Sequence, residues 1–208
     1  RKIVRLDNIE NEVLCATKEL AGEGNKIIDS PISLRIEGST LPDLTLVDLP
    51  GIIYTARGDQ PADIGKQVKE LIHKYIHWEE TIILCVFAGD ADVQTSEALE
   101  YARAVDPELK RTIGVITKVD RIEDPKKRLP AILQEAENEL RLKLGLVAVR
   151  NRNAKERQSK CSSVQADNVE RDWFNAEVPD LPTSQRGMNA LIKKLCDLQA
   201  ENLDRCLP

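Results

Sequence analysis

The sequence lacks several features that would assign a chain to a broad class of proteins. No apolar run approaches the roughly 18 residues that a membrane-spanning helix needs, which argues against a transmembrane segment. Basic residues are not in excess, because 30 Lys and Arg stand against 35 Asp and Glu, for a net charge of −5. A general nucleic-acid binder usually shows a basic stripe, so we expect no nucleic-acid partner.

Cysteine is sparse and follows no recognisable spacing. The five cysteines are odd in number, widely spaced and never arranged as C-x-x-C; they are Cys15, Cys85, Cys161, Cys196 and Cys206. Such spacing predicts neither a disulfide framework nor a zinc site. Cys85 lies within an apolar run, where a small core residue is typical. We therefore expect reduced cysteines and a cytoplasmic location.

The chain does contain an alternation of strand-like and helix-like segments. Its 208 residues suit one α/β domain, and 41% hydrophobic residues suffice for a core. Strands are predicted over Ile32–Ile36, Leu44–Val47, Thr81–Phe87, Arg111–Ile116 and Leu146–Val149, and helices over Leu6–Leu20, Asp63–His77, Ser96–Val105, Pro125–Leu144 and Gly187–Leu207. Ile52–Pro61 is predicted to be a loop, Asn151–Ala176 shows no clear period, and Pro179–Thr183 has the composition of a linker. From Leu44 onward, this order implies a mostly parallel sheet with helices on both faces.

The first candidate motif is Asp48-Leu49-Pro50-Gly51, which follows the apolar run Leu44–Val47. A carboxylate at a strand end can hold a magnesium-bound water, since Mg²⁺ keeps several waters and takes few protein ligands. Gly51 has no side chain, so its N–H can approach a γ-phosphate closely. A D-x-x-G pattern also occurs in plain strand-to-loop turns, so the motif alone leaves both interpretations open.

The second candidate motif, Thr117-Lys118-Val119-Asp120, follows the apolar run that ends at Ile116. The Asp120 carboxylate can accept two hydrogen bonds from the N1–H and the amino group of guanine, a pair of donors that adenine does not offer. The aliphatic stem of Lys118 can lie over the base, and Thr117 can tie the loop to neighbouring backbone. A polar turn after a strand is the alternative for this tetrapeptide alone.

A third candidate follows the last predicted strand. Asn151, Arg152 and Asn153 could border the base or the ribose, although a solvated polar loop explains them equally well. Ligands of parallel sheets bind beyond the carboxyl ends of the strands. All three motifs are expected at such strand ends, and this shared position favours a single site.

Four longer segments carry a family resemblance. Pro42–Ile52, Gly58–Ile64, Val105–Pro107 and Arg111–Asp120 resemble, in the same order, segments of the dynamin superfamily of large GTPases. The resemblance extends over nearly the whole chain. Within the superfamily, Gln60–Gly65 and the helix after it are most similar to the Mx branch, which contains interferon-induced antiviral GTPases.

The resemblance implies an enlarged Ras-like GTPase domain over residues 1–182. Residues 183–208 would form a helix of the bundle signalling element at the start of a stalk. The implied activity is GTP hydrolysis with Mg²⁺, stimulated by dimerisation of GTPase domains and by self-assembly. The residues implied in GTP binding are Asp48, Leu49, Pro50, Gly51, Ile52, Thr117, Lys118, Val119, Asp120, Asn151 and Arg152, with Asp48 holding Mg²⁺ through water and Asp92 contacting the partner domain.

The family's phosphate loop is the feature that this sequence does not show. No G-x-x-x-x-G-K-S/T occurs in the 208 residues, and we expect the first strand, the phosphate loop and the switch threonine to precede Arg1. We therefore expect these residues alone to be inactive, because phosphoryl transfer needs positioned positive charge and backbone donors. The catalytic residues stay unassigned.

Two other interpretations and several roles stay open. The chain could be a non-catalytic pseudo-GTPase that acts as an assembly or scaffolding partner, or an unrelated α/β nucleotide-binding protein. An antiviral and a membrane-remodelling role are both compatible with the resemblance. Membranes, microtubules or viral components would be bound through regions outside these 208 residues.

Overall fold

The computed structural model of the protein describes residues 8–22, 27–39, 41–52, 61–93, 96–159 and 161–206. The chain divides into two compact units, residues 1–75 and 76–208. Several sequence expectations lie partly outside the described residues, among them the first two residues of the helix predicted over Leu6–Leu20 and most of the loop predicted over Ile52–Pro61. Among the described residues, no helix combines the length and the apolar character needed to cross a membrane.

The first unit contains two of the predicted helices. Helix α1 spans Ile9–Ala21 and ends at Gly22, whose φ of +76° places it in the left-handed region and whose N–H donates to Lys18 O. Helix α2 spans Ile64–Ile76. Its apolar residues recur every four positions, and Ile64, Val68 and Ile72 are all buried. Both helices confirm the period-based predictions to within a few residues.

Two predicted strands in the first unit are wrong. In the described ranges 27–39 and 41–52, the segments Ile32–Ile36 and Leu44–Val47 carry no strand. Alternating apolar residues favour a strand only where a neighbouring strand accepts and donates its backbone hydrogen bonds. Neither segment has such a ladder here, and Leu34, Leu46 and Val47 are exposed.

The second unit is built on a parallel sheet whose described strands follow the sequence order β1–β2–β3. These strands span Ile83–Ala88, Thr112–Thr117 and Leu146–Ala148, which confirms three predicted strands. Strand β2 lies in the middle and is buried over residues 112–116. At its Gly114, an added Cβ would lie 2.1 Å from Leu146 Cδ1, so the close packing of β2 on this leucine requires a glycine.

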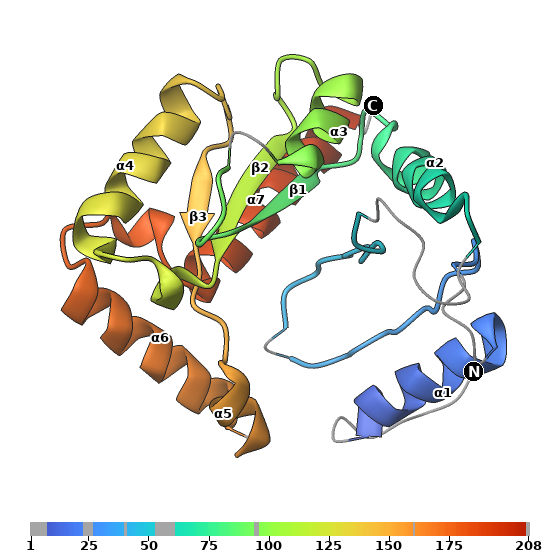
Figure 1. The fold of residues 1–208 in the computed structure, drawn as a ribbon, viewed down its shortest axis with the longest axis horizontal. Coiled ribbons are helices and arrows are strands. Elements are labelled where there is room, and N and C mark those ends of the chain that lie inside the picture. Colours follow the sequence, from blue (N-terminus) through green and yellow to red (C-terminus); the bar gives the residue numbers. More distant parts are fainter. Residues whose placement is uncertain are drawn as a thin grey trace. The chain divides into compact units, whose positions relative to one another are not determined.

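Helices connect and cover these strands (Figure 1). Helix α3, Glu97–Val105, joins β1 to β2, and α4, Pro125–Asn138, joins β2 to β3. The buried Cys85 of β1 donates its Sγ–H to Ala98 O of α3, so this cysteine is the core residue that its apolar run predicts. Helix α7, Met188–Cys206, runs behind the strands in Figure 1. The predicted mostly parallel α/β fold is confirmed.

The prediction of a helix through Leu144 is too long. Helix α4 ends at Asn138, and Arg141 then adopts a left-handed φ of +57°. Leu140 and Leu142 are nevertheless buried. The turn after α4 also packs into the core, and its buried leucines extend the apolar spacing beyond the end of the helix.

The stretch that shows no period, 151–176, contains two helices. Helix α5 spans Ala154–Gln158 and α6 spans Ser163–Glu177. Each begins with a capping box, formed by Asn153 with Glu156 and by Ser162 with Gln165. The predicted linker that follows is packed, because Leu181 is buried, and it leads into a 3₁₀ turn, η3, over Thr183–Gln185.

A buried carboxylate closes the turn between α3 and β2. Asp106 accepts hydrogen bonds from Lys110 N at 2.9 Å and from Arg111 N at 3.0 Å, and its Oδ2 also accepts from the Thr112 hydroxyl at 2.7 Å. Both Asp106 and Thr112 are buried. This network fixes the entry into β2, whose far end carries the second candidate motif.

Candidate functional site

The second candidate motif forms a constrained turn at the carboxyl end of β2. Thr117 is the last residue of the strand, and its hydroxyl donates to Phe87 O of β1 at 3.0 Å. Lys118 takes a left-handed φ of +56°, and the 3₁₀ turn η2 follows over Val119–Arg121. Val119 is fully buried, whereas Lys118 and Asp120 are exposed. The turn therefore presents the Lys118 side chain and the Asp120 carboxylate at the carboxyl end of β2.

Gly89 allows this turn to pack against the end of β1. Its N–H donates to Thr117 O at 2.7 Å. A Cβ at this position would lie 2.9 Å from Ile122 Cγ1 and 3.1 Å from Thr117 O. Any larger residue at position 89 would therefore collide with Ile122 and with the backbone of Thr117.

The third candidate motif lies at the same edge. Residues 150–153, called the base-side loop below, follow β3, and Val149 N donates to Ile116 O of β2 at 2.8 Å. Because β2 and β3 are adjacent and parallel, the structure brings Thr117–Asp120 and the base-side loop to one edge of the sheet. Asn151 and Arg152 are exposed there.

An ion pair holds the base-side loop. The Arg150 guanidinium donates to Glu156 Oε1 at 2.8 Å and to Oε2 at 3.2 Å, and its side chain is 8% exposed. Glu156 Oε2 also accepts from Asn153 N at 2.8 Å. Among the described residues, Arg150 Nε makes no hydrogen bond although it is buried. The pair thus fixes both ends of the loop.

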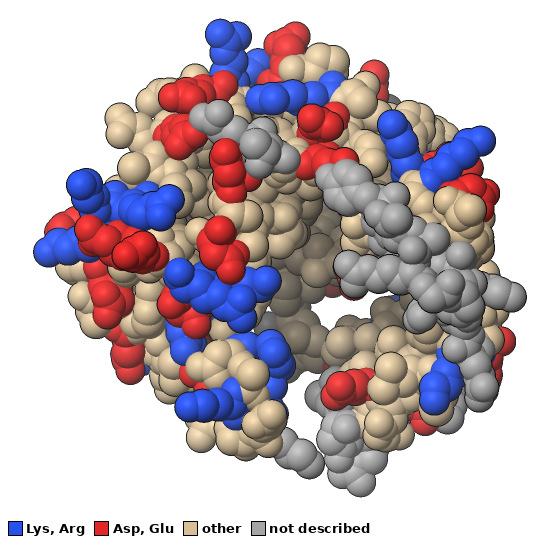
Figure 2. Space-filling model, viewed as in Figure 1, with Lys and Arg blue, Asp and Glu red and all other residues tan. Residues whose placement is uncertain are grey.

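The electrostatics link this pair to the candidate base reader. The hydrogen bond to Glu156 raises the pKa of Arg150 most strongly, and attraction to Glu156, Asp120 and Glu170 adds to this effect. The same pair lowers the pKa of Glu156. On the face of the molecule that Figure 2 shows, the basic and acidic side chains are interspersed.

The first candidate motif belongs to the other unit, and it has no strand before it. Asp48 and Gly51 are exposed, whereas Leu49, Pro50 and Ile52 are half-buried. Within the described ranges, no three His, Cys, Asp or Glu side chains gather as a metal site. A single exposed carboxylate is nonetheless the kind of ligand that fits Mg²⁺, which is bound through few protein groups and several waters.

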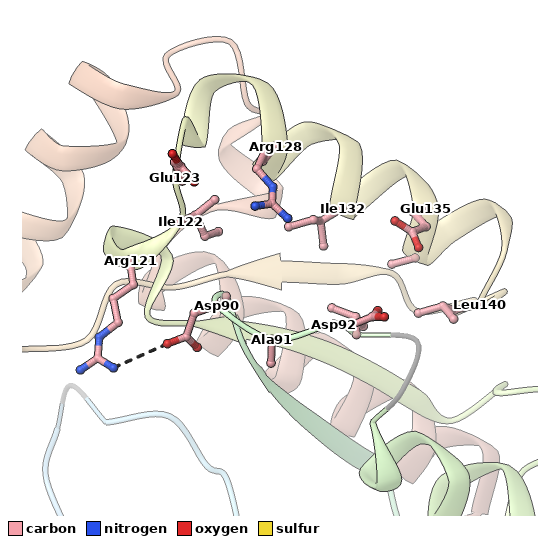
Figure 3. A pocket seen from close by; sticks show the side chains of 13 residues that line it. Asp90, Ala91, Asp92, Arg121, Ile122, Glu123, Arg128, Ile132, Glu135 and Leu140 are labelled. Carbon is pink, nitrogen blue, oxygen red and sulfur yellow. Dashed lines mark ion pairs between the residues drawn. The ribbon is translucent and has the colours of Figure 1, made fainter.

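Asp92 lines a pocket of about 470 Å³ between the loop after β1 and helix α4 (Figure 3). Asp90 and Asp92 come from the loop, and Arg128 and Ile132 come from α4. Arg121, the residue after Asp120, reaches Asp90 at 3.7 Å. The pocket therefore directly neighbours the turn that carries the second motif.

The second unit is thus a parallel α/β sheet that carries a carboxylate-bearing turn and a polar loop at the carboxyl ends of two adjacent strands. Residues 1–119 match the dynamin family. This match covers more than half of the chain, and the protein belongs to the dynamin family.

Individual relatives agree with this assignment. The chain is 38% identical to the interferon-induced GTP-binding protein Mx of Ctenopharyngodon idella, over 96% of this chain and 32% of the relative. It is 42% identical to Mx1 of Canis lupus familiaris, over 80% of this chain and 25% of the relative. It is 37% identical to the dynamin-1-like protein of Danio rerio, over 97% of this chain and 29% of the relative. The chain thus spans a third or less of the length of these relatives.

Two residues of the site region escaped the sequence analysis. Glu156 could have been found from the N-x-x-E spacing of Asn153 and Glu156, which is a capping-box signal. Glu170 accepts a hydrogen bond from Arg150 N, 20 residues away in the sequence, and no local spacing predicts such a contact.

Proposed function

We propose that the protein binds GTP and hydrolyses it to GDP and phosphate as a dynamin-type GTPase. The observation that carries the proposal is the position of Asp120, an exposed carboxylate at the end of β2 beside the loop that follows β3. A carboxylate there pairs with the N1–H and the amino group of guanine and leaves adenine unmatched. The Mx relatives, whose names describe GTP-binding proteins, support this assignment.

The proposal assigns each unit its own part of the nucleotide. Residues of the second unit would contact the base, namely Thr117, Lys118, Val119, Asp120, Asn151 and Arg152, and residues of the first unit would contact the phosphates, namely Asp48, Leu49, Pro50, Gly51 and Ile52. Lys118 would cover the base plane with its aliphatic stem. Asp48 would hold Mg²⁺ through a water. The bound ion would supply positive charge to the phosphate oxygens.

The experiment that tests this function compares GTP with ATP in the full-length protein that carries this sequence. We expect GTP to bind at least about a hundredfold more tightly, because ATP leaves the Asp120 carboxylate unpaired. Phosphate release from GTP should accompany binding. Equal affinities would contradict the proposed base reader, and tight GTP binding without turnover would favour the non-catalytic scaffold.

Residues 1–208 alone are proposed to be inactive. They contain no G-x-x-x-x-G-K-S/T segment, so they lack the backbone donors and the lysine that such a loop gives to the phosphates. The matching experiment measures GTP turnover by this piece beside the full-length protein. Measurable turnover by the piece would refute its inactivity without touching the base reader.

Self-association is the second part of the proposal. Residues 1–182 would form the GTPase domain and 183–208 the helix that leads toward a stalk. Asp92, exposed at the rim of the pocket in Figure 3, would contact a partner GTPase domain and so raise turnover. Asp92→Ala in the full-length protein should then abolish the rise of specific activity with protein concentration. An unchanged rise would remove Asp92 from the contact.

The cellular role is proposed only in outline. The odd and widely spaced cysteines favour a cytoplasmic protein. Antiviral and membrane-remodelling roles both fit a self-assembling GTPase of this family. Binding to membranes, microtubules or viral components would use regions outside the 208 residues.

A further inference from the structure

A buried carboxylate in α6 lies outside every motif described above. Glu170 is 6% exposed, and its two oxygens serve two different segments of the chain. Oε1 accepts from Arg150 N at 2.7 Å, and Oε2 accepts from Met188 N at 2.8 Å. Arg150 opens the base-side loop, and Met188 is the first residue of α7. One side chain therefore joins α6, the base-side loop and α7.

The arrangement needs a carboxylate rather than any polar residue. Burial raises the pKa of Glu170, while the hydrogen bonds from Met188 N and Arg150 N lower it in part. Burying such a group is costly unless both oxygens are satisfied, and here each oxygen receives a backbone N–H. An amide of the same shape keeps only one acceptor oxygen, so it can satisfy only one of the two donors.

The turn before α7 packs directly on this carboxylate. Gly187 has a left-handed φ of +87°, and a Cβ there would lie 3.3 Å from Glu170 Oε2. Its N–H donates to Ala148 O of β3 at 2.8 Å. Two neighbouring backbone N–H groups thus hold the start of α7. Gly187 N donates to Ala148 O of β3, and Met188 N donates to Glu170 Oε2. The unpaired N–H groups of a helix start also favour a nearby negative charge.

We propose that Glu170 is a positioning residue for the base-side loop and couples guanine-nucleotide affinity to the seating of the first turn of α7. Its bond to Arg150 N sets the direction in which the loop leaves β3, and with it the place of Asn151 and Arg152, the residues that would border the base. Coupling between two such positions is reciprocal, so nucleotide binding should also strengthen the Met188–Glu170 bond. This inference rests on the proposed function, because the ligand concerned is a guanine nucleotide.

The test uses Glu170→Gln in the full-length protein, with fluorescent mant-GDP as the probe and GTP as the substrate. Losing one of the two backbone bonds should raise the Kd for mant-GDP and the KM for GTP about tenfold. The kcat at saturating GTP should stay within about twofold, since Glu170 touches neither phosphate nor Mg²⁺ in the proposed site. Amide hydrogen exchange at Arg150 or Met188 should be faster than in the wild type.

Two variants of α6 serve as matched controls. Phe174→Leu trims a buried ring without touching the Glu170 bonds, so it should lower Tm and leave the Kd unchanged. Asp172→Asn removes an exposed carboxylate from the same helix and should change neither quantity. If Phe174→Leu weakens mant-GDP as much as Glu170→Gln does, the effect is general destabilisation and the inference is overturned.

A measurement on the wild type needs no variant to fold. Saturating GDP should slow amide exchange at Met188, and unchanged exchange there would overturn the coupling. If the wild type binds no guanine nucleotide, the proposed function itself fails. If the wild type binds mant-GDP and Glu170→Gln binds it equally well, the inference alone fails.

Discussion

The ion pair between Arg150 and Glu156 supports the base-side loop, and breaking it should cost more than breaking an ordinary surface pair. Two N–O contacts of 2.8 and 3.2 Å join the side chains, which are 8% and 21% exposed. Glu156→Ala would leave the buried Arg150 guanidinium without the carboxylate that accepts its hydrogen bonds, and its Nε already has no partner among the described residues.

The expected magnitude follows from this burial. Removing one partner of a buried pair typically costs about 3–5 kcal/mol. Because Glu156 keeps some exposure, we expect the lower end, a loss of about 3 kcal/mol in the free energy of unfolding for Glu156→Ala. Glu156→Gln should lose only about 1–1.5 kcal/mol, because the amide oxygen still accepts from the guanidinium.

A double-mutant cycle with Arg150→Met and Glu156→Gln isolates the interaction from the cost of each change. Urea unfolding of the four proteins should give a coupling energy above about 1 kcal/mol. The exposed i,i+4 pair of Lys66 and Glu70 is the matched control and should give no more than about 0.5 kcal/mol. Equal coupling energies for the two pairs would refute the reasoning, since burial would then make no difference.

Four further outcomes follow from particular residues. The pKa of Glu156 is lowered from its usual 4.5, so its contribution to stability is present above pH 4.5 and is lost as pH falls through the lowered value. The Tm difference between wild type and Glu156→Gln should therefore shrink on acidification, and a constant difference would contradict this. Asp106→Ala strips three donors of their acceptor and should cost at least about 2 kcal/mol in urea unfolding, with Asp106→Asn costing less. Gly114→Ala places a Cβ 2.1 Å from a leucine methyl and should cost about 1–3 kcal/mol, whereas neutral stability would mean that the sheet can relax there. Asp48→Ala should cut GTP turnover by the full-length protein, and full activity would remove Asp48 from the magnesium shell.

Much of the second unit could be predicted from the sequence because its elements are short, buried and strongly patterned. The apolar runs around Cys85 and Val115 became β1 and β2, and the parallel order followed from the helices between them. The predicted strands at 32–36 and 44–47 failed for the opposite reason. An alternating pattern records which face is apolar, but a strand also needs a partner that the pattern does not name.

Helix α6 was missed because its buried face includes a charged residue. Glu170 and Phe174 are its buried positions, and a glutamate at the first of them hides the apolar period. The capping box at Ser162 was the signal that local reasoning could have used.

The candidate site was likewise predicted only in part from the sequence. The turn at Thr117–Asp120 was visible because it follows a buried strand. The base-side loop is supported by two glutamates. The capping spacing of Asn153 and Glu156 could have indicated the first, whereas Glu170 reaches Arg150 N through tertiary packing, which no spacing in the sequence records.

The central claim is that the edge formed by β2 and β3 recognises guanine through Asp120, and the most direct test is the affinity of Asp120→Asn for GTP and for xanthosine triphosphate. Two charge-assisted hydrogen bonds are lost, so GTP should weaken by at least about a hundredfold in the full-length protein. Xanthosine triphosphate should become the preferred ligand, since the asparagine amide donates where xanthine offers an oxygen. An unchanged ratio of the two affinities would contradict the assignment of Asp120 as the base reader.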